Sequence, residues 1–283
     1  YGFKPMVVED CAHAFGAEFN GKKLSNHGNI CVYSLQAIKH LTTGDGGLIS
    51  LPTKSLYDRC KLLRWYGINR DKRNYKGKDL RLENDIVEYG YKFHMNDINA
   101  TLGTYNLPHM DGLLEKNRRN AKMLDEGLKD IKDVQLLKPN PKCNSAYWLY
   151  TIRVLNGRKQ EFMDKMKEVN IMTSQVANRN DINSCVKEFE EALPNLDILE
   201  KELVCIPVGW WLTHSEIEYI INIVCELFSE KTFQILKNKG IAGLILPSGI
   251  YSDLGTKSLR ELFFEKCSIQ ELCGFVNVKK IFR

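Results

Sequence analysis

The beginning of the chain alternates short apolar runs with glycine-rich and polar stretches. Apolar residues gather at 5–9, 29–34 and 47–51, and the residues between these runs are of the kinds that form turns. The first run has the character of a buried strand and ends in the carboxylate of Asp10. The pattern therefore predicts three strands in the first fifty residues.

A helical period replaces this pattern from residue 54 onward. Leu56, Cys60 and Leu63 fall on one face of a predicted helix over 54–65. Two further segments have the same period and are also predicted to be helices: 96–106 and 111–130.

Two prolines within five residues, at 138–142, predict a hinge between a larger and a smaller domain. Thr213 is a candidate N-cap because Glu216 stands three residues further on. The predicted architecture is an α/β large domain followed by a smaller α+β domain. The elements predicted after the hinge are a strand at 146–155, a helix at 158–169, a strand at 171–176 and a helix at 215–228.

Composition agrees with a soluble enzyme. At 283 residues, 43% of them hydrophobic and 27% charged, the chain can bury a sizeable core and should hold more than one domain. No apolar run approaches the roughly 18 residues of a transmembrane helix, so no membrane contact is expected. Nine cysteines form no CxxC pair and no Cys/His pattern, which predicts no metal site and favours reduced thiols in the cytoplasm.

One lysine has an informative setting. Lys39 lies between Ser34 and a turn with glycines at 44, 46 and 47. Glycine permits positive φ and close backbone approach, so the turn leaves room for a flat ligand while Ser34 can donate to an anion. Lysine forms imines with carbonyl compounds, above all pyridoxal 5′-phosphate (PLP), when its surroundings lower its pKa. The alternative is a solvated lysine before an ordinary glycine turn.

Asp10 strengthens the first interpretation. Ligands of α/β sheets bind outside the carboxyl ends of strands, and PLP needs an acidic residue against its pyridine nitrogen. His13, three residues further on, could reach the ring face or the 3-hydroxyl of the cofactor, or could be a hydrogen-bonded packing residue.

Four ordered blocks carry a family resemblance. The run EDCAHAFGAEFNGKKLSNHGNICVYSLQAIKHLTTGDGGLIS at 9–50 resembles the core of the DegT/StrS-type PLP-dependent aminotransferases, which act on nucleotide-linked keto sugars. Three later blocks resemble the same family: WYGINR at 65–70, ENDIVEYGYKFHMNDINATLG at 83–103 and IPVGWWLTHSEIEYIINIV at 206–224.

The resemblance implies a partial type I aminotransferase large domain in a homodimer. It implies that Lys39 binds the cofactor covalently and moves protons, that Asp10 contacts the pyridine nitrogen and that Ser34 contacts the phosphate. The amino group would pass from glutamate to a nucleotide-linked sugar of the 4-amino-4,6-dideoxyhexose type, as in viosamine and perosamine synthesis. A sugar-dehydrating subgroup carries histidine in place of this lysine and is disfavoured.

Three further residues receive roles from the resemblance. Lys92 would reach the PLP phosphate across a dimer interface and His94 would contact substrate, at positions where relatives often have asparagine and arginine. A solvated Lys92 is the alternative. Arg179 could fork onto the diphosphate of the substrate, or could be an exposed loop arginine.

Family members carry a long segment before the position of Tyr1, and it supplies an aromatic residue that stacks on PLP and part of the phosphate site. We therefore expect an N-terminally truncated chain that is inactive alone. The expected domains are a large PLP-binding domain at 1–137, a small domain at 138–230 and an extension at 231–283.

The extension differs in charge from the rest. It holds nine Lys or Arg against four Asp or Glu, whereas residues 1–230 hold 31 of each. Its sequence resembles the β-α-β segment after the catalytic motif of adenine-specific DNA methyltransferases, although that motif is absent. Nucleic-acid contact is not favoured, because a solvated basic face explains the charge equally well. The alternatives to the enzyme are a DNA-associated protein with a methyltransferase-like tail and an inactive chimeric fragment.

Overall fold

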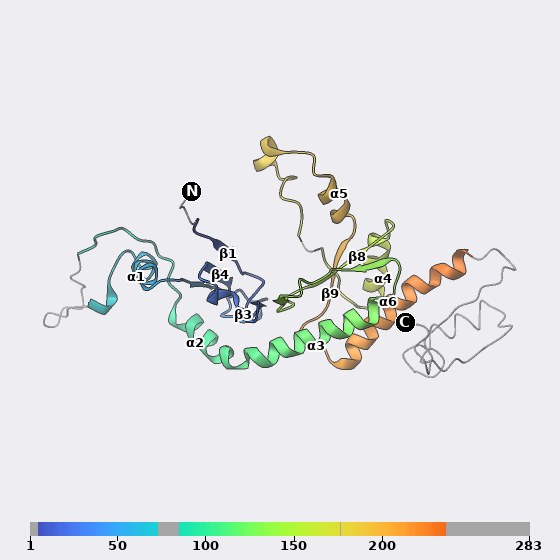
Figure 1. The fold of residues 1–283 in the computed structure, drawn as a ribbon, viewed down its shortest axis with the longest axis horizontal. Helices are drawn as coiled ribbons and strands as arrows, with labels where there is room; N and C mark the ends of the chain where they lie inside the picture. The colour runs from blue at the N-terminus through green and yellow to red at the C-terminus, as the bar shows by residue number, and fades with distance from the viewer. Residues whose placement is uncertain (1–4, 73–84, 176, 236–283) are drawn as a thin grey trace. The chain divides into compact units, whose positions relative to one another are not determined.

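A computed structural model describes residues 5–72, 85–175 and 177–235 (Figure 1). Contacts divide the chain into two compact units. Unit 1 combines residues up to 121 with 138–148 and 208–210, and unit 2 combines 122–137 and 149–207 with the residues from 211. The β-α-β arrangement predicted for the extension lies outside the described residues. The domain boundary predicted at residue 138 stays a prediction.

Unit 1 contains a three-stranded sheet in the order β1-β4-β5, formed by Val8–Asp10, Ile30–Ser34 and Gly47–Ser50. β1 runs parallel to β4, and β5 runs antiparallel to β4. The three strands predicted in this region are confirmed, each within a few residues of its predicted bounds.

A second sheet of unit 1, in the order β3-β2-β7, was not predicted. Its strands are Glu18–Phe19 (β2), Lys22–Lys23 (β3) and Cys143–Asn144 (β7). Asn20 and Gly21 join β2 to β3 with φ values of 48° and 71°, the conformation that two-residue hairpin turns require.

Three predicted helices are confirmed. Thr53 caps α1 (Lys54–Leu63), and Asn96 caps α2 (Asp97–Asn106). α3 (Met110–Leu128) follows, and its residues Met110 and Leu114 pack with Leu35, Leu41 and Ala146 in a buried cluster. Short 3₁₀ turns occupy Leu24–Asn26, Arg70–Lys72, Leu107–His109 and Ser184–Phe189.

Unit 2 contains an antiparallel sheet in the order β6-β8-β9, formed by Val134–Leu136, Tyr150–Val154 and Leu203–Ile206. Its helices are α4 (Lys159–Glu168), α5 (Pro194–Glu200) and α6 (His214–Ile235). Thr213 and Glu216 form the predicted capping box, since the Thr213 amide donates to Glu216 over 2.7 Å and the Glu216 amide donates to Thr213 over 3.3 Å.

The strand predicted at 171–176 is wrong. Of residues 171–175, which the structure describes, only Ser174 pairs, in an isolated bridge with Cys205 of β9. The apolar start of the segment is explained by Ile171, which is buried at the end of α4 instead of within a strand. The place beside β8 belongs to β9, which was not predicted.

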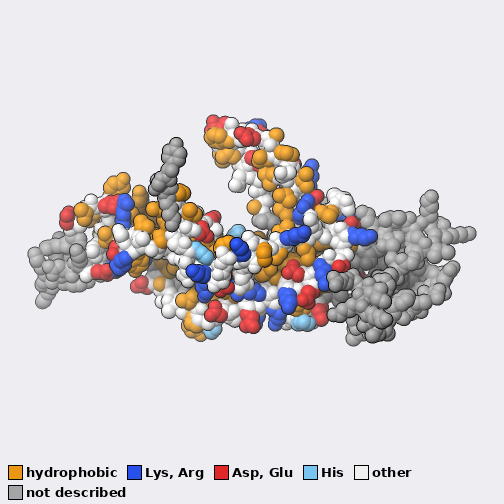
Figure 2. Space-filling view, viewed as in Figure 1, with side chains coloured by type: hydrophobic (Ala, Val, Ile, Leu, Met, Phe, Trp, Pro, Cys, Tyr) orange, Lys and Arg blue, Asp and Glu red, His pale blue; other side chains and the backbone are white. Residues whose placement is uncertain are grey.

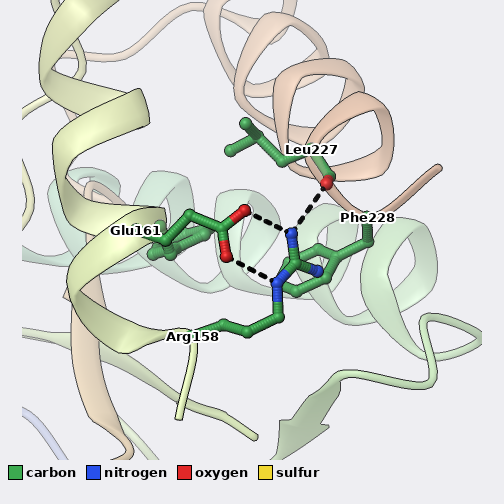
Figure 3. A pocket seen from close by; sticks show the side chains of 5 residues that line it. Arg158, Glu161, Leu227 and Phe228 are labelled. Carbon is green, nitrogen blue, oxygen red and sulfur yellow. Dashed lines mark hydrogen bonds and ion pairs between the residues drawn. The ribbon is translucent and has the colours of Figure 1, made fainter. Parts of the chain in front are cut away.

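Arg158 connects the helices of unit 2 (Figure 3). Its buried guanidinium donates to both carboxylate oxygens of Glu161 over 2.8 Å, to Asp133 over 3.2 Å and to the Leu227 carbonyl over 3.2 Å. It also lies 4.6 Å from the ring centre of Phe228. These contacts join α4, α6 and the turn before β6, and the space among them leaves no room for a water molecule.

None of the helices in the described ranges has the length and apolar character needed to cross a bilayer.

Candidate functional site

The carboxyl ends of β1 and β4 meet at one edge of the sheet because the two strands are parallel. Asp10 ends β1 opposite Val32, and Ser34 ends β4 opposite Gly47. The loop at 35–46 leaves this edge and returns as β5. Hydrogen bonds from the Leu35 amide to Gly46 (2.8 Å) and from the Thr43 amide to Leu35 (2.9 Å) close the neck of the loop.

The loop is held on both sides. Leu35 and Leu41 anchor it in the apolar core. From α2, Asn99 donates to the Asp45 carbonyl over 2.8 Å and Asn106 donates to the Thr42 carbonyl over 3.0 Å. The position of Lys39 is therefore set by packing as well as by local turns.

Two of the three glycines of the turn adopt the positive φ that the sequence predicted, and the third, Gly47, begins β5. Gly44 and Gly46 have φ values of 80° and 141°. A Cβ at Gly46 would lie 2.8 Å from the Met95 methyl and 2.9 Å from Thr43 Oγ1, so a larger residue has no room there.

Lys39 is half-buried, and its Nζ lies 3.8 Å from the ring centre of Trp148. Burial lowers the pKa of the Lys39 amine, and the Asp10 carboxylate opposes this effect. The direction agrees with the need of an imine-forming lysine for a free amine. The catalytic role itself stays a prediction.

Asp10 is exposed, and its Oδ1 accepts a hydrogen bond from the Ala12 amide over 3.0 Å. The pKa of His13 is lowered by burial and by the charge of Lys39, while Asp10 acts in the opposite direction. The His13 ring stacks on Trp148 with 3.7 Å between centroids. The structure thus brings Asp10, His13 and Lys39 together.

Ser34 lies at the same edge, half-buried. Its Oγ accepts from the Gln36 amide over 3.4 Å, which leaves its hydroxyl proton able to point to an anion.

Lys92 and His94 form a different group, around Trp65. Exposed Lys92 pairs with Trp65 in an isolated bridge, and the His94 ring lies 3.5 Å from that of Trp65. Burial lowers the pKa of His94, and the charges of Lys92 and Arg70 lower it further. Among the described residues no recorded contact joins this group to Lys39.

Arg179 belongs to unit 2, and its guanidinium is hydrogen-bonded to carboxylates. Its Nε donates to Asp181 over 2.9 Å, and its Nη1 is bonded to Asp197. These partners raise the pKa of the guanidinium. A phosphate would have to displace one of them.

Sequence reasoning missed Trp148, because nothing in the hydrophobic period distinguishes it from a packing residue. It also missed a cluster of Glu9, Cys11 and Cys31, whose ligand-type atoms lie within 4.8 Å of one another on one face of the sheet. Strand alternation could have revealed this cluster, since Glu9 pairs with Cys31 in register. Burial and the neighbouring Cys31 raise the pKa of the Cys11 thiol to about 11, which favours a protonated packing residue.

An open hollow of about 610 Å³ lies along α2, lined by residues that include Thr101, Tyr105 and His109. It does not include Lys39. The candidate site therefore rests on the amine and carboxylate at the sheet edge and not on this hollow.

The chain is similar to known aminotransferases and to a synthase of an amino sugar nucleotide. GDP-perosamine synthase of Escherichia coli O157:H7 is 26% identical over 231 residues, which are 80% of this chain and 59% of that protein. UDP-4-amino-4-deoxy-L-arabinose–oxoglutarate aminotransferase of Shewanella sediminis is 25% identical over 242 residues, 81% of this chain and 62% of that protein. The chain thus spans about three fifths of the length of these relatives.

Among solved structures, the sugar aminotransferase CalS13 of Micromonospora echinospora is 41% identical, with a TM-score of 0.71 over 78% of this chain and 58% of that one. The profile of the Eco57I restriction-modification methylases matches residues 217–282. The profile of the DegT/DnrJ/EryC1/StrS aminotransferases matches residues 4–225, and the chain therefore belongs to that family.

Proposed function

We propose that this chain is the Lys39-bearing part of a PLP-dependent sugar aminotransferase. The reaction moves an amino group from glutamate to a nucleotide-linked keto-deoxy sugar of the 4-amino-4,6-dideoxyhexose type, in a cytoplasmic homodimer. The observation that carries the proposal is the meeting of the Lys39 amine and the Asp10 carboxylate at one sheet edge. The names of the two relatives, a GDP-perosamine synthase and a UDP-4-amino-4-deoxy-L-arabinose aminotransferase, support a nucleotide-linked amino sugar as the substrate class.

The residues present fit PLP. The cofactor has an aldehyde, a pyridine nitrogen and a phosphate, and the edge offers an amine, a carboxylate and a hydroxyl. When bound, PLP withdraws electrons from the carbon that carries the amino group. A lysine whose pKa is lowered by burial supplies the nucleophile that such a ligand needs.

Each residue at the edge has a distinct task. Asp10 would hold a proton on the pyridine nitrogen by its negative charge. Lys39 would hold the cofactor through Nζ and would move a proton to and from the substrate carbon. Ser34 would donate a hydrogen bond from its hydroxyl to a phosphate oxygen.

Lys92, His94 and Arg179 complete the proposal outside this edge. Lys92 would contact, as a point charge, the phosphate of the PLP that the neighbouring subunit binds. His94 would contact the substrate beside it. Arg179 binds the diphosphate after exchanging a carboxylate partner.

A second candidate function is DNA association through the tail. The observation that favours it is the match of residues 217–282 to the methylase profile. Binding of the chain to duplex DNA at two salt concentrations tests it, because phosphate contacts weaken steeply with salt.

The enzyme is tested by PLP capture. We would compare the 283-residue chain with a fusion that places the N-terminal segment of the Micromonospora enzyme before residue 5. Borohydride reduction should fix PLP on the Lys39 peptide of the fusion, as detected by mass spectrometry, and glutamate should yield 2-oxoglutarate. Lys39→Ala should abolish both results, while Lys122→Ala, on an exposed side chain of α3, should preserve them. PLP fixed specifically on another lysine would refute the assignment.

A further inference from the structure

We propose that Trp148 is a positioning residue for Lys39, which it holds both through the adjacent backbone and through the amine. The inference rests on the function proposed above for Lys39. It uses contacts of Trp148 that the proposed function does not require.

The backbone contact is a hydrogen bond. The Trp148 indole N–H donates over 2.8 Å to the carbonyl oxygen of Ile38, the residue that precedes Lys39. Ala146, two residues before the indole, is buried in the same apolar cluster as Leu35 of the loop. The donor and its acceptor therefore rest on one core, which gives the bond a fixed geometry.

The second contact is made by the ring face. Lys39 Nζ lies over the indole at 3.8 Å, and the His13 ring is stacked on it at 3.7 Å with an interplanar angle of 26°. Both groups therefore contact the Trp148 ring system directly, so a change at Trp148 changes the surroundings of the Lys39 amine.

This arrangement acts on the charge and the place of the amine. An aromatic face attracts an ammonium but not a neutral amine, so the indole opposes the effect of burial on Lys39. Because burial and Lys39 lower the pKa of His13, the imidazole is neutral near pH 7 and adds no second cation to the ring. Trp148 thus holds the Lys39 ammonium against the indole ring until a ligand with a carbonyl group displaces this contact.

Two substitutions separate the two contacts. Trp148→Phe keeps an aromatic face but removes the N–H donor, whereas Trp148→Leu removes both. Trp211→Leu, which removes an exposed tryptophan of unit 2, is the matched control. The full 283-residue chain would be labelled with acetic anhydride over a range of pH, and the Lys39 peptide would be quantified against that of exposed Lys122.

We expect Trp148→Leu to lower the pH midpoint of Lys39 labelling by about 0.5 to 1 unit relative to Trp148→Phe. Both variants should accelerate hydrogen exchange of loop 35–46 amides about fivefold, the effect of one lost hydrogen bond. The Trp211→Leu control should change neither quantity.

A Trp148→Leu midpoint equal to that of the wild type, or loop exchange unchanged in Trp148→Phe, would overturn the inference. If Trp148→Leu does not fold, exchange in Trp148→Phe decides. If the proposed function is wrong, borohydride reduction will fix no PLP on Lys39 of the fusion. Acetic anhydride labelling of Lys39 would still show whether Trp148 contacts its amine.

Discussion

The Asp10 carboxylate acts in the same direction on two basic side chains, those of Lys39 and His13. Burial lowers the pKa of both Lys39 and His13, and Asp10 raises both. The two basic groups also repel each other, since the Lys39 charge lowers the pKa of His13. The protonation state of this edge is thus a property of the group of three and not of any one residue.

Replacing Asp10 tests this coupling. Asp10→Asn should raise the activation free energy of transamination by about 2 to 4 kcal/mol. The rate of the fusion enzyme should then fall roughly a hundredfold or more. The same change removes a charge that raises the pKa of Lys39, so more of the amine is neutral at a given pH. PLP capture should then shift to lower pH while turnover falls. Both quantities can be followed by absorbance and by 2-oxoglutarate release.

Glu18→Gln, on the hairpin strand β2, is a control for the loss of one acidic charge from unit 1. Turnover of Asp10→Asn within a few fold of the wild type would exclude the assignment.

The sequence indicated Lys39, Asp10 and Ser34 because each stands at a strand end or a glycine turn, where local chemistry is visible. Trp148 was not predictable in the same way. It reaches Ile38 across more than a hundred residues, and no local pattern records such a contact. The Asp197 partner of Arg179 was missed for a related reason, since it approaches only through the fold of unit 2, whereas Asp181 stands two residues away and is a local signal.

Among the elements, the longer apolar or periodic segments were predicted, whereas the short strands β6, β7 and β9 were not. The helix at α3 and the capping box of α6 are local features. β9 is a four-residue strand whose pairing with β8 spans about fifty residues. The β2–β3 hairpin and the helix α5 were also not predicted, although the Asn20-Gly21 turn of the hairpin is a local signal.

Substitution of Arg158 tests whether its contacts stabilise the packing of α4 and α6 in unit 2. Arg158→Met should lower the free energy of unfolding of unit 2 by about 2 to 3 kcal/mol, because the Leu227 carbonyl and the Asp133 carboxylate both lose a buried charged donor. Denaturant unfolding measures the change. The control, Lys122→Met, removes a loose pair with Glu126 at 3.9 Å and should cost less than about 0.5 kcal/mol. Equal effects of the two substitutions would contradict the structural role of Arg158.

At the scale of the molecule, the sheet β1-β4-β5 that carries Asp10 and Ser34 also has an exposed apolar face. Val8, Val32 and Ile49, which the strand register places on one face of the sheet, are 41% to 62% exposed. Figure 2 shows hydrophobic side chains gathered on the visible face over β1 and β4. Within the described residues β1 and β5 are the outer strands of this sheet, and an outer strand presents backbone groups that can pair with another chain.

Such a surface predicts self-association of the 283-residue chain. Burying a valine or isoleucine contributes about 1.5 to 3 kcal/mol, so the double variant Val8→Lys with Ile49→Lys should weaken association about tenfold or more. Sedimentation over a concentration series would show the wild-type mass rising beyond that of a dimer and the variant mass rising less. Met172→Lys, at a residue of unit 2 that is 84% exposed, is the control and should behave as the wild type. The prediction is contradicted if the apparent mass of the wild-type chain does not change with concentration. It is also contradicted if Met172→Lys weakens association as much as the double variant does.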